Sequence, residues 1–157
     1  MKTAFIYNKA YYLNKIELML HLEEKTLREI LNKVEKNPEE TCGFLLGKSN
    51  KNDKTIATFI AAKNVSKNNK AQRYEISPKA YLMAEKAALE NKMEILGIYH
   101  THLNWPANPS ETDRLAAFPG LSYMIISLRE QVFSDIKSWL LTEDFSFKEE
   151  KIELKII

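Results

Sequence analysis

Two of the three histidines in this 157-residue chain, His100 and His102, are separated by a single residue. They follow the apolar run MEILGIY (93–99), which predicts a strand covered on both faces. Because side chains at positions i and i+2 of a strand point to the same side, both imidazoles can converge on one point. Neutral imidazole is a common ligand of Zn²⁺, and a catalytic zinc usually has three protein ligands and an open position for water. The pair therefore indicates a metal site that needs a third ligand.

The third ligand is expected among the acidic residues that follow. Asp113 is the first carboxylate expected on an ordered element, because the segment SETD (110–113) opens a predicted short helix through Ala117, and Glu111 is the alternative. Ser110 followed three residues later by an acid also matches a helix capping box, and taken alone the pattern favours that interpretation. The two roles are compatible. A helix that begins beside the histidines would bring Ser110 and Asp113 into one site.

A metal-bound water that acts as a nucleophile also needs a group that moves its protons. Glu39 and Glu40 are candidates, but adjacent residues of an extended chain point to opposite sides, so only one can face the metal. The residues alone do not choose between them, and composition favours two solvated charges in a loop. Cys42 has no histidine partner that is not already used, so we expect it to be a packing residue. His21 belongs to no motif and is expected to be structural or on the surface.

The order H-T-H, seven residues, then S-E-T-D resembles the H-x-H-x7-S-x-x-D signature of the JAMM (MPN+) zinc metalloproteases. The segment PEETCGFLLG (38–47) is similar to the family's P-x-E-x-C-G-x-L-x-G segment. The resemblance also covers RYEI (73–76) and SWL (138–140), so it spans about residues 16 to 155. The stretch PANPS (106–110) is most similar to the bacterial branch, which includes peptidases that act on sulfur-carrier proteins.

The resemblance implies a role for each residue of the motif. The ligands of one Zn²⁺ ion would be His100, His102 and Asp113, with Glu40 as the general acid/base and Ser110 as a donor to the oxyanion. The implied reaction is hydrolysis of an amide bond at the C-terminal, Gly-Gly-type tail of a sulfur-carrier or ubiquitin-like protein. The chain's modest length favours release of an amino acid or small adduct over cleavage of polyubiquitin.

The chain departs from the family after His102, where a proline is usual and Leu103-Asn104-Trp105 stands instead. Trp105 is therefore a candidate contact to the substrate. A catalytically silent MPN-type scaffold that binds partner proteins is the alternative function, although the loss of ligands that marks such scaffolds is not seen. A zinc deaminase needs H-x-E with P-C-x-x-C, which a chain with one cysteine cannot supply.

Several elements must position these residues. Alternating or continuous apolar runs predict strands, at 16–22, 41–47, 55–62, 93–100, 121–127, 136–141 and 147–157, with 73–76 as a further candidate. Apolar spacing of three and four residues predicts a helix at 24–36, and Ser77-Pro78 is a typical start for a second helix through Glu90. Strands and helices mix without strict repetition, which indicates an α/β fold with three layers around a mixed sheet. The resemblance implies the JAB/MPN architecture, similar to that of cytidine deaminases.

The chain as a whole fits one catalytic domain over residues 16–157, with residues 1–15 as an arm of uncertain structure. A net charge of +2 without a basic block argues against binding to nucleic acid or a membrane surface. A single cysteine excludes an intramolecular disulfide, and no apolar run approaches the roughly 20 residues of a membrane span. We expect a cytoplasmic protein. The sequence is compatible with either a monomer or a homo-oligomer.

Overall fold

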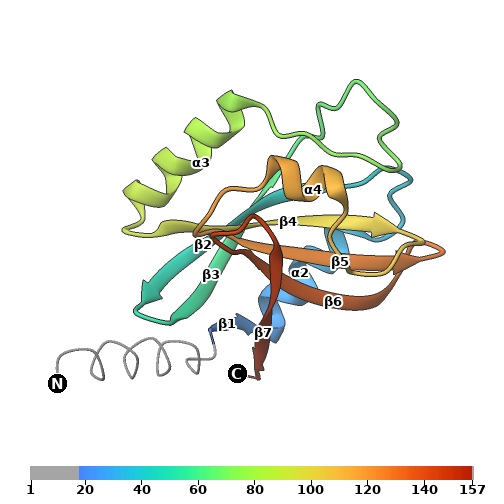
Figure 1. Ribbon diagram of the computed structural model, residues 1–157. Coiled ribbons are helices and arrows are strands. Elements are labelled where there is room, and N and C mark those ends of the chain that lie inside the picture. Colours follow the sequence, from blue (N-terminus) through green and yellow to red (C-terminus); the bar gives the residue numbers. More distant parts are fainter. Residues whose placement is uncertain (1–17, 157) are drawn as a thin grey trace, which may run out of the picture.

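The computed structural model describes residues 18–156, which form seven strands and three helices (Figure 1). The strands are β1 (Met19–Glu23), β2 (Cys42–Asn50), β3 (Asp53–Ala62), β4 (Glu94–Leu103), β5 (Ser122–Arg129), β6 (Val132–Leu141) and β7 (Phe147–Lys155). The helices are α2 (Glu24–Val34), α3 (Pro78–Glu90) and α4 (Glu111–Ala116). Each predicted helix is confirmed, and so is each predicted strand except the candidate at 73–76. The expected arm at residues 1–15 lies outside the described residues.

The strands form one mixed sheet in the order β1-β3-β2-β4-β5-β6-β7, and β1 also pairs with β7, so the sheet closes into a barrel. The mixed α/β fold is as expected, whereas nothing in the sequence indicated the closure. β1 runs parallel to both of its neighbours. The His21 side chain lies between them, with Nε2 3.5 Å from Asp53 of β3 and Nδ1 2.5 Å from Glu153 of β7. His21 thus has a structural position at the closure.

Two apolar clusters lie on opposite faces of the central strands. Because side chains alternate along β2, Leu45 packs with Ile30 of α2 in one cluster, while Phe44 packs with Ala84 of α3 in the other. In Figure 1, α3 and α4 lie above these strands and α2 lies below them. The strands between the helices, β4 and β5, are covered on both faces, which explains their continuous apolar sequences.

The segment RYEI (73–76) is irregular, so its prediction as a strand was wrong. One backbone bond, from Val65 N to Glu75 O, joins it to the chain that follows β3. The other bonds come from a side chain: Asn64 donates to Arg73 O and accepts from Glu75 N. A side chain therefore satisfies the backbone groups that a neighbouring strand would otherwise satisfy.

Helix α3 begins as the sequence predicts. The Ser77 hydroxyl accepts a hydrogen bond from Ala80 N, and Pro78 occupies the first turn. None of the helices within residues 18–156 has both the length and the apolar character needed to cross a membrane.

Candidate metal centre and active site

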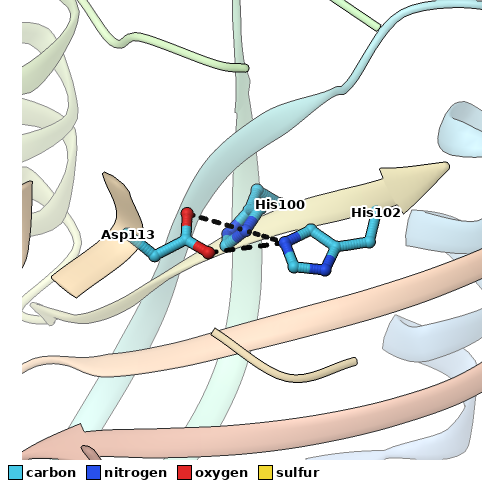
Figure 2. A group of neighbouring side chains, drawn as sticks. All are labelled: His100, His102 and Asp113. Atoms are coloured by element: carbon cyan, nitrogen blue, oxygen red, sulfur yellow. Dashed lines mark hydrogen bonds and ion pairs between the residues drawn. The ribbon is translucent and has the colours of Figure 1, made fainter. Parts of the chain in front are cut away.

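The two histidines of β4 and one aspartate of α4 form a buried cluster (Figure 2). His100 and His102 have their Nε2 atoms 3.1 Å apart. The Asp113 carboxylate lies across both rings, with Oδ1 3.3 Å from His100 Nε2 and Oδ2 3.4 Å from His102 Nε2. One potential ligand atom from each residue falls within 4.8 Å of the other two. His100 and His102 lie on the same side of β4, and they therefore meet Asp113, from the start of α4, at a single point.

The hydrogen bond made by His102 Nδ1 leaves the Nε2 lone pair of the neutral ring free to bind a cation. His102 Nδ1 lies 2.8 Å from the carbonyl oxygen of Pro106, which can only accept, so Nδ1 carries a proton. In the neutral ring Nε2 then has only a lone pair, and it faces a carboxylate oxygen that also has only lone pairs. A divalent cation between them would satisfy both atoms, and a backbone carbonyl behind a ligating imidazole is a common arrangement at zinc sites.

His100 is held by packing. Its ring stacks on Tyr74, with the ring centroids 4.4 Å apart and the planes 23° from parallel. The ring is fully buried, and within residues 18–156 its Nδ1 has no hydrogen-bond partner. Tyr74 therefore fixes the orientation of this imidazole through contact with its face.

Burial and mutual contact control the charges of the cluster. Burial lowers the pKa of His100, which favours the neutral form that a metal requires. Burial also opposes the charge of His102, but its hydrogen bonds to Asp113 and Pro106 outweigh that effect and raise its pKa. Burial would raise the pKa of Asp113, yet hydrogen bonds with His100 and His102 hold it below the ordinary value of a carboxyl. The aspartate is thus charged at neutral pH, as a ligand of a metal cation would need to be.

Ser110 and Asp113 form the capping box and belong to the cluster at the same time. Ser110 Oγ accepts from Asp113 N at 3.1 Å, and Asp113 Oδ2 accepts from Ser110 N at 2.7 Å. Since the hydroxyl oxygen is the acceptor in the cap, its proton stays available to another group. Glu111, the alternative ligand, instead pairs with Arg114 on the exposed side of α4. Of the two acids, only Asp113 faces the histidines.

Glu40 is buried beside this cluster, whereas Glu39 is exposed. Burial raises the pKa of Glu40 to about 7, a rise that His102 opposes and the Asp113 carboxylate increases. A carboxyl with a pKa near neutrality can both take up and release a proton at pH 7. The tertiary structure thereby distinguishes two glutamates that the residues alone left equivalent.

A cavity of about 770 Å³ opens on the cluster. Its wall includes two members of the cluster, His102 and Asp113, together with Glu40 and Ser110. Much of the remaining wall is aromatic, from Tyr74, Tyr81, Trp105, Phe118 and Tyr123. Trp105 also has 61% of its surface exposed, so this ring both lines the cavity and faces solvent.

Cys42 is a packing residue, as expected. It is buried in β2, and its Sγ approaches the carbonyl oxygen of Ala62 at 3.7 Å. Burial, with a contribution from Glu40, raises the pKa of the thiol to about 12. A thiol with so high a pKa is not a nucleophile at neutral pH.

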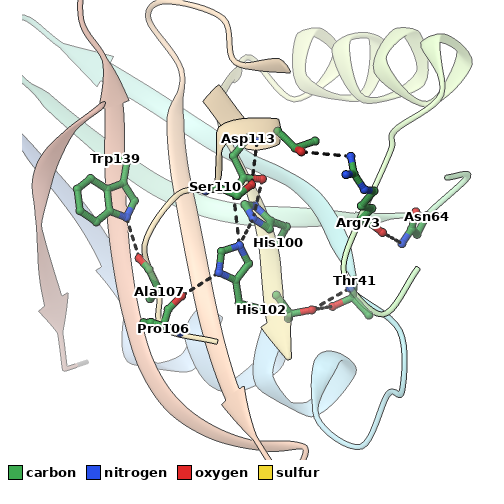
Figure 3. A network of polar contacts seen from close by, with 12 residues as sticks. Thr41, Asn64, Arg73, His100, His102, Pro106, Ala107, Ser110, Asp113 and Trp139 are labelled. Atoms are coloured by element: carbon green, nitrogen blue, oxygen red, sulfur yellow. Dashed lines mark hydrogen bonds and ion pairs between the residues drawn. The ribbon is translucent and has the colours of Figure 1, made fainter. Parts of the chain in front are cut away.

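Three groups that support the site were not foreseen: the Tyr74 ring, and the Pro106 carbonyl and Asn64 amide that are drawn in Figure 3. Tyr74 lies in the RYEI segment that carries the family resemblance, so its sequence position was a signal. A backbone carbonyl has no sequence signal. Asn64 lies in a polar stretch, KNVSKNNK (63–70), whose composition indicated only a loop.

Known proteins resemble this chain over most of its length. A family model described as prokaryotic homologs of the JAB domain matches residues 23–142. Desampylase from Pyrococcus furiosus is 31% identical over 134 residues, which cover 85% of this chain and 89% of that protein. Desampylase from Haloferax volcanii is 32% identical over 91 residues, or 57% of this chain and 63% of that protein.

Two solution structures share the fold. A protein from Desulfitobacterium hafniense superimposes with a TM-score of 0.78 at 33% identity, covering 88% of this chain and 94% of that one. A protein from Salinibacter ruber superimposes with a TM-score of 0.61 at 36% identity, covering 81% and 88% of the two chains.

Proposed function

Because this chain belongs to the family of prokaryotic JAB-domain proteins, we propose that it is a zinc-dependent peptidase or isopeptidase acting on the C-terminal, Gly-Gly-type tail of a sulfur-carrier or ubiquitin-like protein. The observation that carries the proposal is the convergence of His100, His102 and Asp113 in one buried cluster, with Glu40 buried beside it. The relatives named desampylase support the choice of a carrier-protein tail as substrate.

Each group of the site has a task in amide hydrolysis. A zinc ion held by His100, His102 and Asp113 would polarise the scissile carbonyl and lower the pKa of a bound water. Glu40 takes a proton from the attacking water and returns it to the leaving amine, a role worth typically about 10²- to 10⁴-fold in rate. The Ser110 hydroxyl donates to the carbonyl oxygen as negative charge develops there. Loss of one such donor commonly costs about 10²- to 10³-fold.

The cavity indicates how the tail is received. A tail that ends in glycines can lie extended in a narrow site because it has no bulky side chains. The exposed ring of Trp105 would contact the tail or the body of the carrier, where the chain departs from the family pattern. Residues 72–76 also line the cavity, so the substrate would contact both this segment and the loop after β4.

The test uses a ubiquitin-like carrier whose C-terminal Gly-Gly is followed by a short peptide. The zinc-loaded protein should shorten the carrier by the mass of the extension, and a chelator should stop the reaction. Glu40→Gln should bind one zinc ion per chain but lose turnover, because the amide cannot take up the proton. Glu39→Gln, which alters the exposed neighbour, is the matched control and should stay active.

Near-normal turnover by the Glu40 variant would overturn the role of that residue. Absence of any chelator-sensitive mass shift, with zinc bound, would favour the alternative of a catalytically silent scaffold.

A further inference from the structure

The backbone of Glu40 is held by a loop and not by the sheet. Glu40 precedes β2, which begins at Cys42. Its N–H donates to the carbonyl oxygen of Lys70 at 2.7 Å, and its carbonyl oxygen accepts from Asn64 Nδ2 at 2.9 Å. Both partners belong to the connection between β3 and α3, residues 63–77. The position of the proposed acid/base therefore depends on the conformation of this connection.

The Asn64 amide satisfies all of its hydrogen-bonding capacity within this connection and with Glu40. Its Nδ2 donates to Glu40 O and to Arg73 O, both at 2.9 Å. Its Oδ1 accepts from Ser66 N at 3.1 Å and from Glu75 N at 3.2 Å. The reverse orientation of the amide would place oxygen against two carbonyl oxygens, so the network itself determines the orientation. The residue is buried, and only an amide supplies two donors beside an acceptor at this point.

The far end of the connection contacts the metal cluster. Tyr74, between the two residues that Asn64 binds there, stacks on His100. Arg73 Nη1 donates to Thr112 Oγ1 of α4 at 3.2 Å, next to Asp113 (Figure 3). One side chain thus links the backbone of Glu40 to a segment that packs on one histidine and on the helix of the third ligand.

We propose that Asn64 is a positioning residue of the active site, which sets the place of Glu40 relative to the metal cluster. This inference rests on the proposed function. Proton transfer is sensitive to small displacements, and a shift of about 1 Å can lower a rate by about 100-fold. The backbones of the ligands are held by β4 and α4, so one zinc ion should still bind without Asn64, even though Asn64 also supports the segment whose Tyr74 stacks on His100.

The expected result is a loss in kcat without a loss of metal. Asn64→Ala should lower kcat by about 10- to 100-fold, with KM changed about twofold at most and one zinc ion still bound. Asn64→Asp keeps the acceptor for Ser66 N and Glu75 N but loses the donors to Glu40 O and Arg73 O, so it should show a similar loss. Asn69→Ala is the matched control, because Asn69 is an exposed residue of the same connection whose side chain accepts from Ala71 N.

A comparison of two substrates distinguishes displacement of Glu40 from partial unfolding of the variant. One carrier tail ends in an amide of a basic amine, and the other ends in an aminocoumarin amide, whose leaving amine is weakly basic. Glu40 returns a proton to the leaving amine, so its displacement should matter less for the aminocoumarin. The Asn64 variants should therefore lose at least several-fold less activity on that substrate, whereas partial unfolding would lower both activities equally.

Other results of these measurements would overturn the proposed role of Asn64. Equal losses on the two substrates, a change in KM alone, or an unchanged kcat in Asn64→Ala would overturn the inference. If neither Asn64 variant folds or retains zinc, Asn64 is a residue of the fold and the inference also fails. Wild-type protein without chelator-sensitive turnover on either substrate would overturn the proposed function itself, and this inference with it.

Discussion

At the scale of single residues, Glu40 shows how the proposed activity works against stability. A carboxylate that is 5% exposed loses most of its hydration, and burial raises its pKa from 4.5 to about 7. Above pH 7 the folded protein must keep a charge that the unfolded chain would solvate freely. The residue proposed for proton transfer thus makes the metal-free protein less stable at the pH where the enzyme would work.

The first prediction concerns the stability of the metal-free protein. Between pH 4.5 and 7 the folded state holds the Glu40 proton more tightly than the unfolded state, so stability falls as the pH rises through this window. The loss of folding stability is complete above pH 7. A rise in the pKa from 4.5 to about 7 corresponds to about 3 kcal/mol, at about 1.4 kcal/mol per pKa unit. Glu40→Gln should be more stable than wild type by up to about this amount at pH 8 and gain little at pH 4.

Urea unfolding after chelation measures this difference. The exposed Glu39→Gln control should match wild type at both pH values. A Glu40→Gln protein that is no more stable at pH 8 than wild type would contradict the assigned burial cost.

The second prediction concerns Trp105, which lines the cavity but is largely exposed. Trp105→Ala should raise KM for a carrier protein by about 5- to 10-fold, the equivalent of about 1 kcal/mol for an exposed aromatic contact. The value of kcat should change little, because the ring is not among the groups that move protons. Phe145→Ala is the control, since Phe145 is similarly exposed and is not part of the cavity wall. A fall in kcat with unchanged KM would count against a binding role.

At the scale of elements, the site combines residues of a rigid strand with residues of a helix that is too short to be stable alone. β4 lies between β2 and β5, so the two histidines have a fixed backbone. α4 has six residues, too few to be stable alone, and its capping box orders its first turn. Because the acid of the box is also Asp113, the conformation that caps the helix is the one that faces the two histidines.

The third prediction separates the two roles of Ser110. Ser110→Ala removes the side-chain acceptor for Asp113 N, so zinc affinity should fall about fivefold, the equivalent of about 1 kcal/mol for a lost cap. The variant should also lose about 10²- to 10³-fold in kcat. Ser110→Asp restores a good cap and should recover zinc affinity, but an ionised carboxylate cannot donate to the oxyanion, so kcat should stay low.

Competition with a chromogenic chelator measures the affinity, and the carrier assay measures kcat. Recovery of kcat in Ser110→Asp would show that the hydroxyl proton has no part in the reaction.

At the scale of the whole molecule, pairings between distant parts of the chain hold the site. Residues 41 and 101 illustrate this: Thr41 N donates to Thr101 Oγ1 at 2.9 Å, and Thr101 N donates to Thr41 O at 3.0 Å. These bonds place the start of β2 beside the end of β4, hence Glu40 beside the histidines. A metal bound between β4 and α4 would add a further link across the fold.

The fourth prediction is that zinc stabilises the folded chain. At a free zinc concentration about 1,000 times Kd, binding to the folded state alone should add about 4 kcal/mol. For a chain of this size that corresponds to a rise in Tm of roughly 8 to 16 °C. Scanning calorimetry with and without zinc measures the shift, and His102→Ala should abolish most of it. An equal shift in that variant would mean that zinc binds elsewhere.

Local spacing predicted the helices, all strands but the candidate at 73–76, and the histidine pair, while the family resemblance chose Asp113 over Glu111 as the third ligand. The strand period aligned His100 with His102, and the cap pattern placed Asp113 in the first turn of a helix, because both depend on neighbours within a few residues. The same spacing could not choose Glu40 over Glu39, foresee the closure of β1 on β7, or show that residues 73–76 are bound by Asn64. Those features depend on contacts across 9 to 132 positions, such as Asn64 with Arg73, Glu40 with Asn64 and His21 with Glu153. Only the folded chain decides them, because burial and pairing between distant segments have no period along the sequence.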